Sequence, residues 1–206
     1  MKILALELSS SVGSIAFCGG KESPDFRTFP ADRKDSGLFY ENLQAIYQHD
    51  GPPDLIVVGL GPGSYAGVRI SIATALGLGV ASGARLRGLP SIYAIEREEY
   101  FFVGDARRAS FVFAHVIDGR AVEGPSLASA EEVGAKLGAL TGVPAVATEP
   151  LAQFEELGAG APARRLVIEH PSALRLIELA RRGEGSDEEK LEPIYLRAPY
   201  ITVPAK

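Results

Sequence analysis

The sequence has 206 residues, a net charge of -5 and a single cysteine, Cys18. This length allows one large domain or two small ones with real cores. The negative charge argues against a protein that holds nucleic acid through its own basic surface, and one cysteine excludes an internal disulfide framework. Met1–Glu7 reaches an acid before any signal-like run forms, and Ser71–Ala84 is too short to span a bilayer. We therefore expect a cytoplasmic protein that makes no membrane contact.

The first half of the chain predicts the order β-β-β-α-β-α-β-α from its apolar runs and turn residues. Strands are predicted at Ile3–Leu8, Ser14–Cys18, Asp25–Phe29, Leu55–Val58 and Arg85–Leu89. Helices are predicted from Asp35 to His49, from Ala66 to Gly83 and from Pro90 to Glu98.

The second half repeats this order in outline. Strands are predicted at Tyr100–Val103, Phe111–Ile117, Ala121–Glu123, Pro144–Thr148 and Leu166–Glu169, and helices at Ala130–Leu140, Leu151–Leu157 and Ser172–Arg182. Gly183–Lys190 is a charged linker, and the tail Leu191–Lys206 has apolar residues that are expected to pack on the fold. The pattern predicts an α/β protein with lobes at residues 1–98 and 99–182, followed by the linker and tail at 183–206.

A glycine-rich loop, Gly59–Arg69, joins an apolar strand to an apolar helix. Backbone N–H groups at such a helix start can bind an anion. The loop lacks the lysine of a phosphate-binding P-loop after Gly67, and it is not a G-x-G-x-x-G fingerprint. Two interpretations stay open, a tight turn needed for packing and an anion site.

The chain resembles the bacterial TsaB family, also called YeaZ, over nearly its whole length. The family motif G-P-G-S-[FY]-T-G-[LV]-R is similar to residues 61–69, which read Gly-Pro-Gly-Ser-Tyr-Ala-Gly-Val-Arg. Weaker similarities are Glu7–Ser9 to D-T-[AS], Arg33–Gly37 to R-x-H-S-E, Val103–Arg107 to [VI]-[DG]-A-R and Pro193–Arg197 to P-x-Y-[LV]-R. The chain departs from the family at Glu7, Asp35, Gly37 and Ala66, where members commonly have Asp, His, Glu and Thr.

The resemblance implies an actin-like ATPase (RNase H-like) fold with two β-β-β-α-β-α lobes. It also implies a scaffold subunit, without catalysis of its own, in the complex that makes threonylcarbamoyladenosine (t6A) in tRNA. The implied partners are a TsaD-type catalytic subunit and a TsaE-type ATPase, with a homodimer when the chain is alone. Contact with tRNA is expected only through the complex, and ATP with Mg²⁺ only within it.

Catalytic alternatives find little support in the residues. His49, His115 and His170 are the three histidines, and no two are spaced as zinc ligands on a helix, so we expect neither a metal site nor a peptidase. A small ATP-binding phosphotransferase of this fold stays as the alternative, because such enzymes hold Mg²⁺ through an acid at the end of the first strand. Here that residue is Glu7, and Asp105, next to Arg107 and Arg108, is more simply a turn residue. The degenerate nucleotide or anion site would comprise Glu7, Ser9, Ser10, Gly61, Gly63, Ser64 and Gly67.

The helix after the glycine loop is apolar nearly all round. One face would pack on a sheet, so the opposite face is expected to be covered by a partner. Small residues four apart would let another helix approach closely. The predicted interface comprises Leu38, Phe39, Leu43, Arg69, Ile72, Ala73, Leu76, Gly79 and Val80, with Arg69 pairing with a carboxylate or a partner rather than a phosphate.

Overall fold

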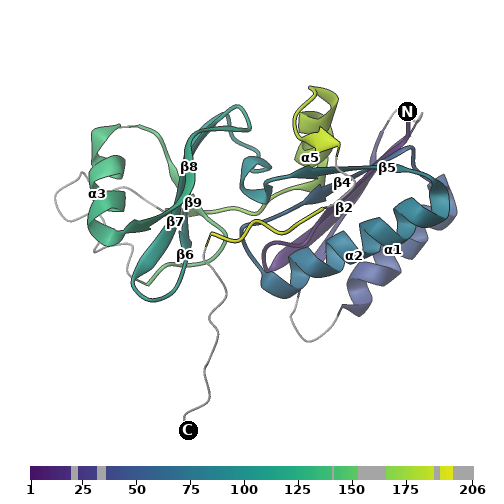
Figure 1. Ribbon diagram of the computed structural model, residues 1–206, viewed down its shortest axis with the longest axis horizontal. Coiled ribbons are helices and arrows are strands. Elements are labelled where there is room, and N and C mark those ends of the chain that lie inside the picture. Colours follow the sequence, from purple (N-terminus) through teal and green to yellow (C-terminus); the bar gives the residue numbers. More distant parts are fainter. Residues whose placement is uncertain (20–22, 32–35, 141, 153–165, 188–190, 197–206) are drawn as a thin grey trace, which may run out of the picture.

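The computed structural model describes residues 1–19, 23–31, 36–140, 142–152, 166–187 and 191–196. Two lobes lie side by side, and each is built on one mixed sheet (Figure 1). In both sheets the first three strands are antiparallel neighbours, and a parallel strand then joins the first of them. The predicted α/β fold class is confirmed.

The first sheet has the strand order β11-β5-β4-β1-β2-β3. Its strands are β1 (Ile3–Glu7), β2 (Val12–Cys18), β3 (Asp25–Pro30), β4 (Leu55–Gly59), β5 (Arg85–Leu89) and β11 (Ser186–Asp187). β1 is central, pairing antiparallel with β2 and parallel with β4. Because β1 and β4 are buried on both faces, they read in the sequence as continuous apolar runs.

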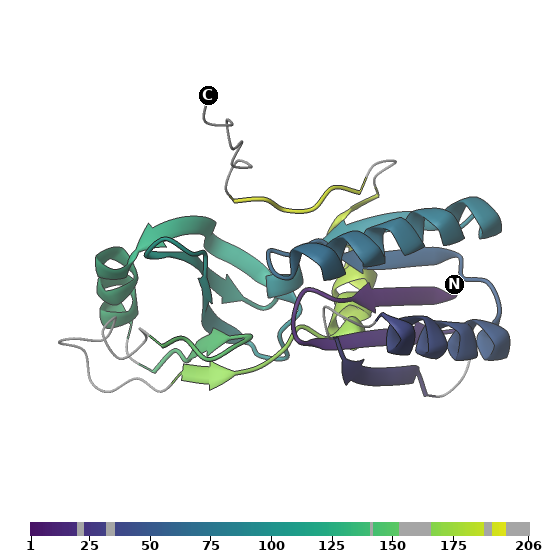
Figure 2. The same cartoon turned by 90° about the horizontal axis from the view of Figure 1, so that it is seen from below.

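Three helices of the described chain cover this sheet. α1 (Gly37–Asp50) and α2 (Tyr65–Ser82) lie on one face, and α5 (Ala173–Arg181) lies on the other (Figures 1 and 2). Alternate residues of β1 divide between the two layers, since Leu4 and Leu6 pack with α1 and α2 whereas Ile3 and Ala5 pack with α5.

The second sheet has the order β10-β9-β6-β7-β8, which is the same spatial arrangement as β5-β4-β1-β2-β3 of the first. Its elements are β6 (Glu99–Asp105), β7 (Ser110–Ile117), β8 (Arg120–Ser129), α3 (Ala130–Ala139), β9 (Ala145–Ala147) and β10 (Leu166–Ile168). α3 begins at a capping box in which Ser129 and Glu132 each satisfy a backbone N–H of the other residue.

The structure differs from the predicted elements in three places. The helix predicted from Pro90 to Glu98 is a short 3₁₀ turn, Ser91–Tyr93, so that prediction was wrong. The helix predicted at 172–182 is confirmed as α5, but it packs on the first sheet rather than in the second lobe, so the chain crosses back after that lobe. The charged linker contains β11, which pairs antiparallel with β5. The predicted helix at 151–157 lies largely outside the described residues.

The start of the tail packs on the fold, as predicted. Leu191 is buried in the core of the first lobe, and the backbone N–H of Ile194 donates to the carbonyl of Leu60. The rest of the predicted tail, residues 197–206, lies outside the described part of the chain.

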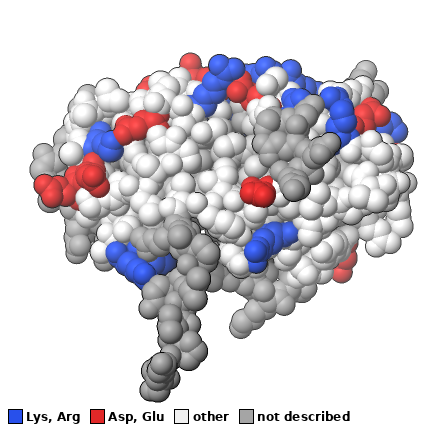
Figure 3. All heavy atoms as spheres, in the orientation of Figure 1, with Lys and Arg blue, Asp and Glu red and all other residues white. Residues whose placement is uncertain are grey.

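Ion pairs join the lobes on the side of α5. Asp118, in the turn between β7 and β8, pairs with Arg182 at 2.6 Å and with Arg175 at 3.3 Å. Arg97 and Glu169, one on each crossover between the lobes, form a two-bond pair. Figure 3 shows that basic side chains gather along the upper edge of the molecule, where α5 lies in Figure 1, with acidic ones among them.

α2 is, among the described helices, the one long and apolar enough to cross a membrane, with a mean hydropathy of 1.3 and 28% of its residues buried. Length and composition alone are weak evidence for a span, since core helices of soluble proteins also meet them. Here Val68, Ile72 and Ala75 pack into the core of the first lobe.

Candidate functional site

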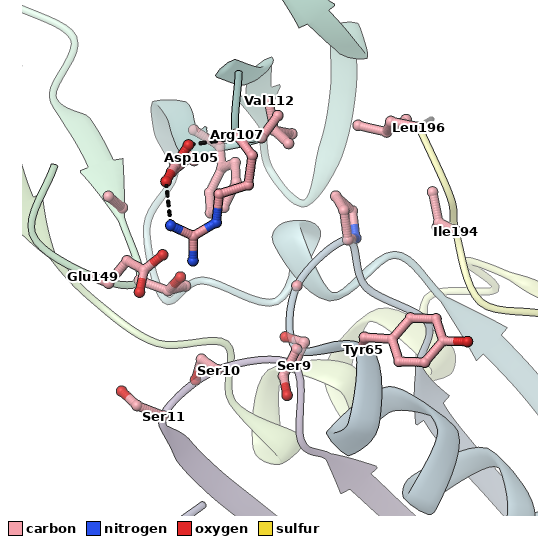
Figure 4. A pocket seen from close by; sticks show the side chains of 18 of the residues that line it. Ser9, Ser10, Ser11, Tyr65, Asp105, Arg107, Val112, Glu149, Ile194 and Leu196 are labelled. Carbon is pink, nitrogen blue, oxygen red and sulfur yellow. Dashed lines mark hydrogen bonds and ion pairs between the residues drawn. The ribbon is translucent and has the colours of Figure 1, made fainter. Parts of the chain in front are cut away.

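A cavity of about 870 Å³ lies between the lobes (Figure 4). The first lobe contributes the β1–β2 turn, Ser9–Ser11, and the glycine loop, Pro62–Tyr65. The second lobe contributes the end of β6 with Asp105 and Arg107, and the segment after β9 with Thr148 and Glu149. Ile194, Tyr195 and Leu196 of the tail close one side. The hydroxyls and charges therefore come from chain segments far apart in the sequence.

The glycines of the loop allow two backbone segments to touch. A Cβ on Gly63 would lie 2.2 Å from the carbonyl oxygen of Ser9, and a Cβ on Gly67 would lie 2.0 Å from that of Leu8. Real Cβ atoms do not approach an oxygen so closely, so both positions require glycine. This contact favours packing as the reason for the glycines.

The N–H groups at the start of α2 are partly used within the protein. Ser64 donates its backbone N–H to the carbonyl of Ser9 at 2.6 Å, and the Ser64 hydroxyl accepts the N–H of Gly67 at 3.3 Å. Ser64 is therefore the N-cap of α2. Gly61 donates its N–H to the Ser91 hydroxyl at 2.9 Å, on the buried side of the loop.

Glu7 does not reach the cavity. Its side chain is fully buried, and Oε1 accepts the backbone N–H of Ser9 at 2.6 Å. Oε2 has no hydrogen bond among the described residues, although the Ser91 hydroxyl lies beside it. Burial raises the pKa of the Glu7 carboxyl, and the hydrogen bond from Ser9 and the nearby Ser91 hydroxyl only partly oppose that shift. The residue lies beneath Gly59, where there is no side chain to exclude it.

The predicted site residues thus separate into two groups. Ser9, Ser10, Gly63 and Ser64 line the cavity together. Glu7, Gly61 and Gly67 support the loop from the buried side and are not part of the lining. Asp105 is the last residue of β6 and not part of the turn, which corrects that prediction, although it does pair with Arg107 as its neighbours in the sequence indicated. The sequence around Glu149 contains no motif that would have marked this residue as part of the cavity lining.

His170 is the histidine nearest this site, and its Nδ1 lies 3.2 Å from the Ser10 hydroxyl. Ser10 donates its hydroxyl proton to the carbonyl of Val12 at 2.8 Å, so the imidazole must be the donor in this contact. Partial burial lowers the pKa of His170, which favours the neutral ring. This geometry does not activate Ser10 as a nucleophile, because a general base would have to accept its proton.

Asp25, His49 and Asp50 bring possible metal-ligand atoms within 4.8 Å of one another at the far end of the first sheet from the cavity. Arg27 already pairs with the Asp25 carboxylate at 3.2 Å through two nitrogens. Exposed acidic groups of this kind are common without an ion.

The predicted interface residues fall into a buried set and an exposed set. Phe39, Leu43 and Ile72 belong to the core of the first lobe, because the apolar face of α1 packs on β2 and β3 and that of α2 packs on β4. These three cannot offer a surface to a partner, which corrects the prediction. Gly79 is half-buried, and a Cβ there would meet Leu86 at 3.0 Å.

The remaining predicted residues form an exposed row that we call the α2 stripe. Arg69, Ala73, Leu76 and Val80 follow one another along the outer face of α2, with Val80 90% exposed. Leu38 of α1 is also exposed, on the same face of the sheet (Figure 2). The guanidinium of Arg69 lies over the ring of Tyr65 at 4.4 Å, and Tyr65 in turn contacts Tyr195. Arg69 therefore stacks on an aromatic ring.

Comparison with known proteins agrees with this architecture. Residues 50–170 match the family described as TsaD, tRNA N6-adenosine threonylcarbamoyltransferase. An uncharacterized protein of Mycobacterium leprae is 37% identical over 83 residues, which are 39% of this chain and 23% of that protein. An uncharacterized protein of Mycobacterium tuberculosis is 36% identical over 83 residues, which are 39% of each. The chain thus spans well under half the length of these curated relatives.

Two solved structures share the fold. An uncharacterized protein from Pseudomonas aeruginosa, with similarity to peptidase YeaZ, superposes with a TM-score of 0.76 at 23% identity, covering 95% of this chain and 99% of that one. YeaZ from Pseudomonas aeruginosa gives a TM-score of 0.75 at 22% identity over the same shares. The family match covers more than half of the sequence, which confirms the resemblance found in its motifs. The chain belongs to the TsaD family and is a TsaB/YeaZ-like protein.

Proposed function

We propose that this protein is a non-catalytic scaffold subunit of the tRNA t6A modification complex, and that it binds a TsaD-type catalytic subunit. The observation that carries the proposal is the α2 stripe. One face of α2 fills the core of the first lobe, and the opposite face exposes the apolar residues Ala73, Leu76 and Val80 after Arg69. Contiguous apolar surface of this kind is typical of interaction sites.

Aromatic and arginine side chains extend the same surface. Tyr65 and Tyr195 are 61% and 49% exposed, and Arg69 stacks on Tyr65. Tyrosine and arginine are the residues that most often dominate binding energy in interfaces. The surface therefore combines an apolar helix face with the side chains that usually anchor a partner.

The absence of catalysis in the proposal rests on two arrangements. The Glu7 carboxyl is held inside the sheet, so it does not offer the cleft a ligand for Mg²⁺, and the residues present do not fit a Mg-ATP site of this fold. Ser10 gives its proton to a backbone carbonyl, which does not suit a peptidase nucleophile. ATP and Mg²⁺ would then act only within the complex, on other subunits.

The resemblance to the TsaB family is what supports the remaining parts of the proposal. We propose a TsaE-type ATPase as the third component, a homodimer through the α2 stripe when the chain is alone, and a cytoplasmic location without membrane contact. With a net charge of -5, the chain would meet tRNA only through the complex.

One observation favours a second function, a small ATP-binding phosphotransferase. The cavity is large enough for a nucleotide and is lined by Ser9, Ser10 and Ser64. Calorimetry of the isolated chain with Mg-ATP distinguishes the two functions. Tight binding that Glu7→Ala abolishes would support the phosphotransferase.

Replacing Val80 with aspartate is expected to abolish the complex with the TsaD-type subunit of the same organism. A charge within an apolar contact should weaken binding on the order of 100-fold, the effect of losing one hot-spot residue. Size-exclusion chromatography with light scattering measures the complex and the chain alone. Because Val80 is 90% exposed, the variant should fold normally, whereas a charge at the buried Phe39 would disrupt the core.

Val122→Asp is the matched control. Val122 is 59% exposed on β8, at the edge of the second sheet, so it places the same charge on a different surface. It should leave the complex intact. The proposed interface would be contradicted if both variants lost binding to the same extent, or if the parent chain did not bind the TsaD-type subunit.

A further inference from the structure

The turn between β6 and β7 has an unusual backbone. Arg107, Arg108 and Ala109 all have positive φ, at 64°, 55° and 53°, and none is glycine. L residues rarely adopt this region, and three in succession are rarer. Such conformations cost free energy, so they persist only where the surrounding structure holds the residue in place. This turn lies at the wall of the cavity, because Arg107 lines it.

The turn holds the Arg107 guanidinium at the cavity. Asp105 accepts the backbone N–H of Arg107 at 2.7 Å with one carboxylate oxygen and pairs with the guanidinium at 3.1 Å with the other. Asp105 therefore fixes both the backbone and the side chain of Arg107. The remaining N–H groups of the guanidinium are available to a ligand, since the Arg107 side chain is 74% exposed.

A second carboxylate lies beside this pair. Glu149, after β9, lines the same cavity and has no ion pair within the described part of the chain. In the view of Figure 4 the guanidinium lies between the carboxylates of Asp105 and Glu149, above Ser10. An arginine oriented by one acid, with another acid next to it, presents both a positive and a negative group to one ligand.

We propose that the cavity binds the zwitterionic head group of an α-amino acid or of a small amino-acid conjugate. The ligand carboxylate is held by Arg107, in the two-bond geometry that guanidinium and carboxylate favour. The ligand ammonium is held by Glu149. The apolar wall formed by Phe102, Val112 and Leu127 receives the side chain or the attached group.

Other ligand charges fit less well. A triphosphate carries only negative charge and would face two carboxylates with a single arginine, so the lining repels it. A simple cation would face Arg107. A zwitterion satisfies both signs, and the exposure of Arg107 and Glu149 to solvent makes the site weak, with a dissociation constant on the order of 1 mM. The proposal does not depend on the scaffold role, because the α2 stripe lies outside this group of charges.

The test is an NMR titration of the uniformly ¹⁵N-labelled full chain with a panel of free L-α-amino acids, each paired with its N-acetyl and methyl ester derivatives. We expect shifts at Ser10, Gly104 and Thr148 with free amino acids. Either derivative should bind about tenfold or more weakly, because each removes one charged partner. Arg107→Gln and Glu149→Gln should each weaken binding to the same degree.

Arg108→Gln is the control, because Arg108 shares the turn and its backbone conformation but is not among the cavity-lining residues. It should leave the affinity unchanged. The proposal is overturned if no free amino acid binds below about 10 mM, if the blocked derivatives bind equally well, or if Arg108→Gln weakens binding as much as Arg107→Gln. Shifts at these amides with Mg-ATP alone would assign the cavity to nucleotides instead.

Discussion

Gly67→Ala is expected to lower the free energy of unfolding by about 3 kcal/mol, the upper range for overpacking a well-packed site. The new Cβ would lie 2.0 Å from the carbonyl oxygen of Leu8. That atom is backbone at the end of the central strand, so no side chain can rotate away to make room. Either α2 must move outward or the β1–β2 turn must shift. Urea denaturation followed by circular dichroism measures the change, which should also lower the melting temperature by about 10 °C.

The same helix supplies the matched control. Gly77 has no heavy atom within 4 Å of a built Cβ, and it is exposed. Gly77→Ala should therefore stabilise the protein by about 0.5–1 kcal/mol, since alanine loses less backbone entropy in a helix. If both substitutions changed the free energy of unfolding equally, the contact with Leu8 would not be the reason for glycine at position 67. The interpretation of the loop as an anion site would then be favoured.

Periodicity was sufficient to predict most of the first sheet. β1, β2 and β4 read as short apolar runs between turn residues, because each is buried on both faces. The helix predicted after Pro90 failed for a tertiary reason. Ile92, Ala94 and Ile95 are all buried, so this segment has no polar face to turn toward water, and the carbonyl of Ala94 accepts the N–H of Ser172 instead.

The sequence also could not show which way an apolar helix faces. Leu38 and Phe39 are neighbours in α1, yet Leu38 is 41% exposed and Phe39 is 3% exposed. Only the position of the sheet decides between them. In α2 the pattern is more ambiguous still, because nearly every residue is apolar or small, so Ile72 and Val80 look alike until the fold is known.

The cavity was the least predictable feature. Ser10, Arg107 and Glu149 are far apart in the sequence and come from three different connections. No local motif joins them, and only the repeated strand order brings the ends of β1, β6 and β9 to one cleft. The glycine loop, which was conspicuous in the sequence, contributes shape to this cleft through Gly63 and Ser64.

Glu7→Gln is expected to stabilise the protein at neutral and higher pH, with little effect near pH 4.5. Burial raises the pKa of Glu7 in the folded protein above its ordinary value of 4.5. The folded state therefore binds a proton that the unfolded state releases. The stability contributed by neutral Glu7 is complete below about pH 4.5 and is lost as pH rises toward the raised pKa. Glutamine keeps an oxygen for the N–H of Ser9 and does not titrate.

The advantage of Glu7→Gln over the parent should grow by about 1.4 kcal/mol for each pH unit until the folded pKa is passed. Unfolding free energies in urea at pH 5, 6, 7 and 8, at constant ionic strength, measure this slope. Glu7→Ala separates titration from packing, since it leaves the Ser9 N–H without its acceptor and should be less stable than the parent at pH 5 by about 2 kcal/mol.

A difference between Glu7→Gln and the parent that stays constant from pH 5 to 8 would mean that Glu7 is ionised inside the sheet. The Ser9 hydrogen bond and the Ser91 hydroxyl would then be sufficient to hold a buried carboxylate, and a negative charge would lie directly behind the glycine loop. The expected slope means the opposite, a neutral carboxyl that ties the β1–β2 turn to the sheet. In that case the acid at the end of β1 serves the packing of this lobe, because it joins the backbone of the β1–β2 turn to the sheet.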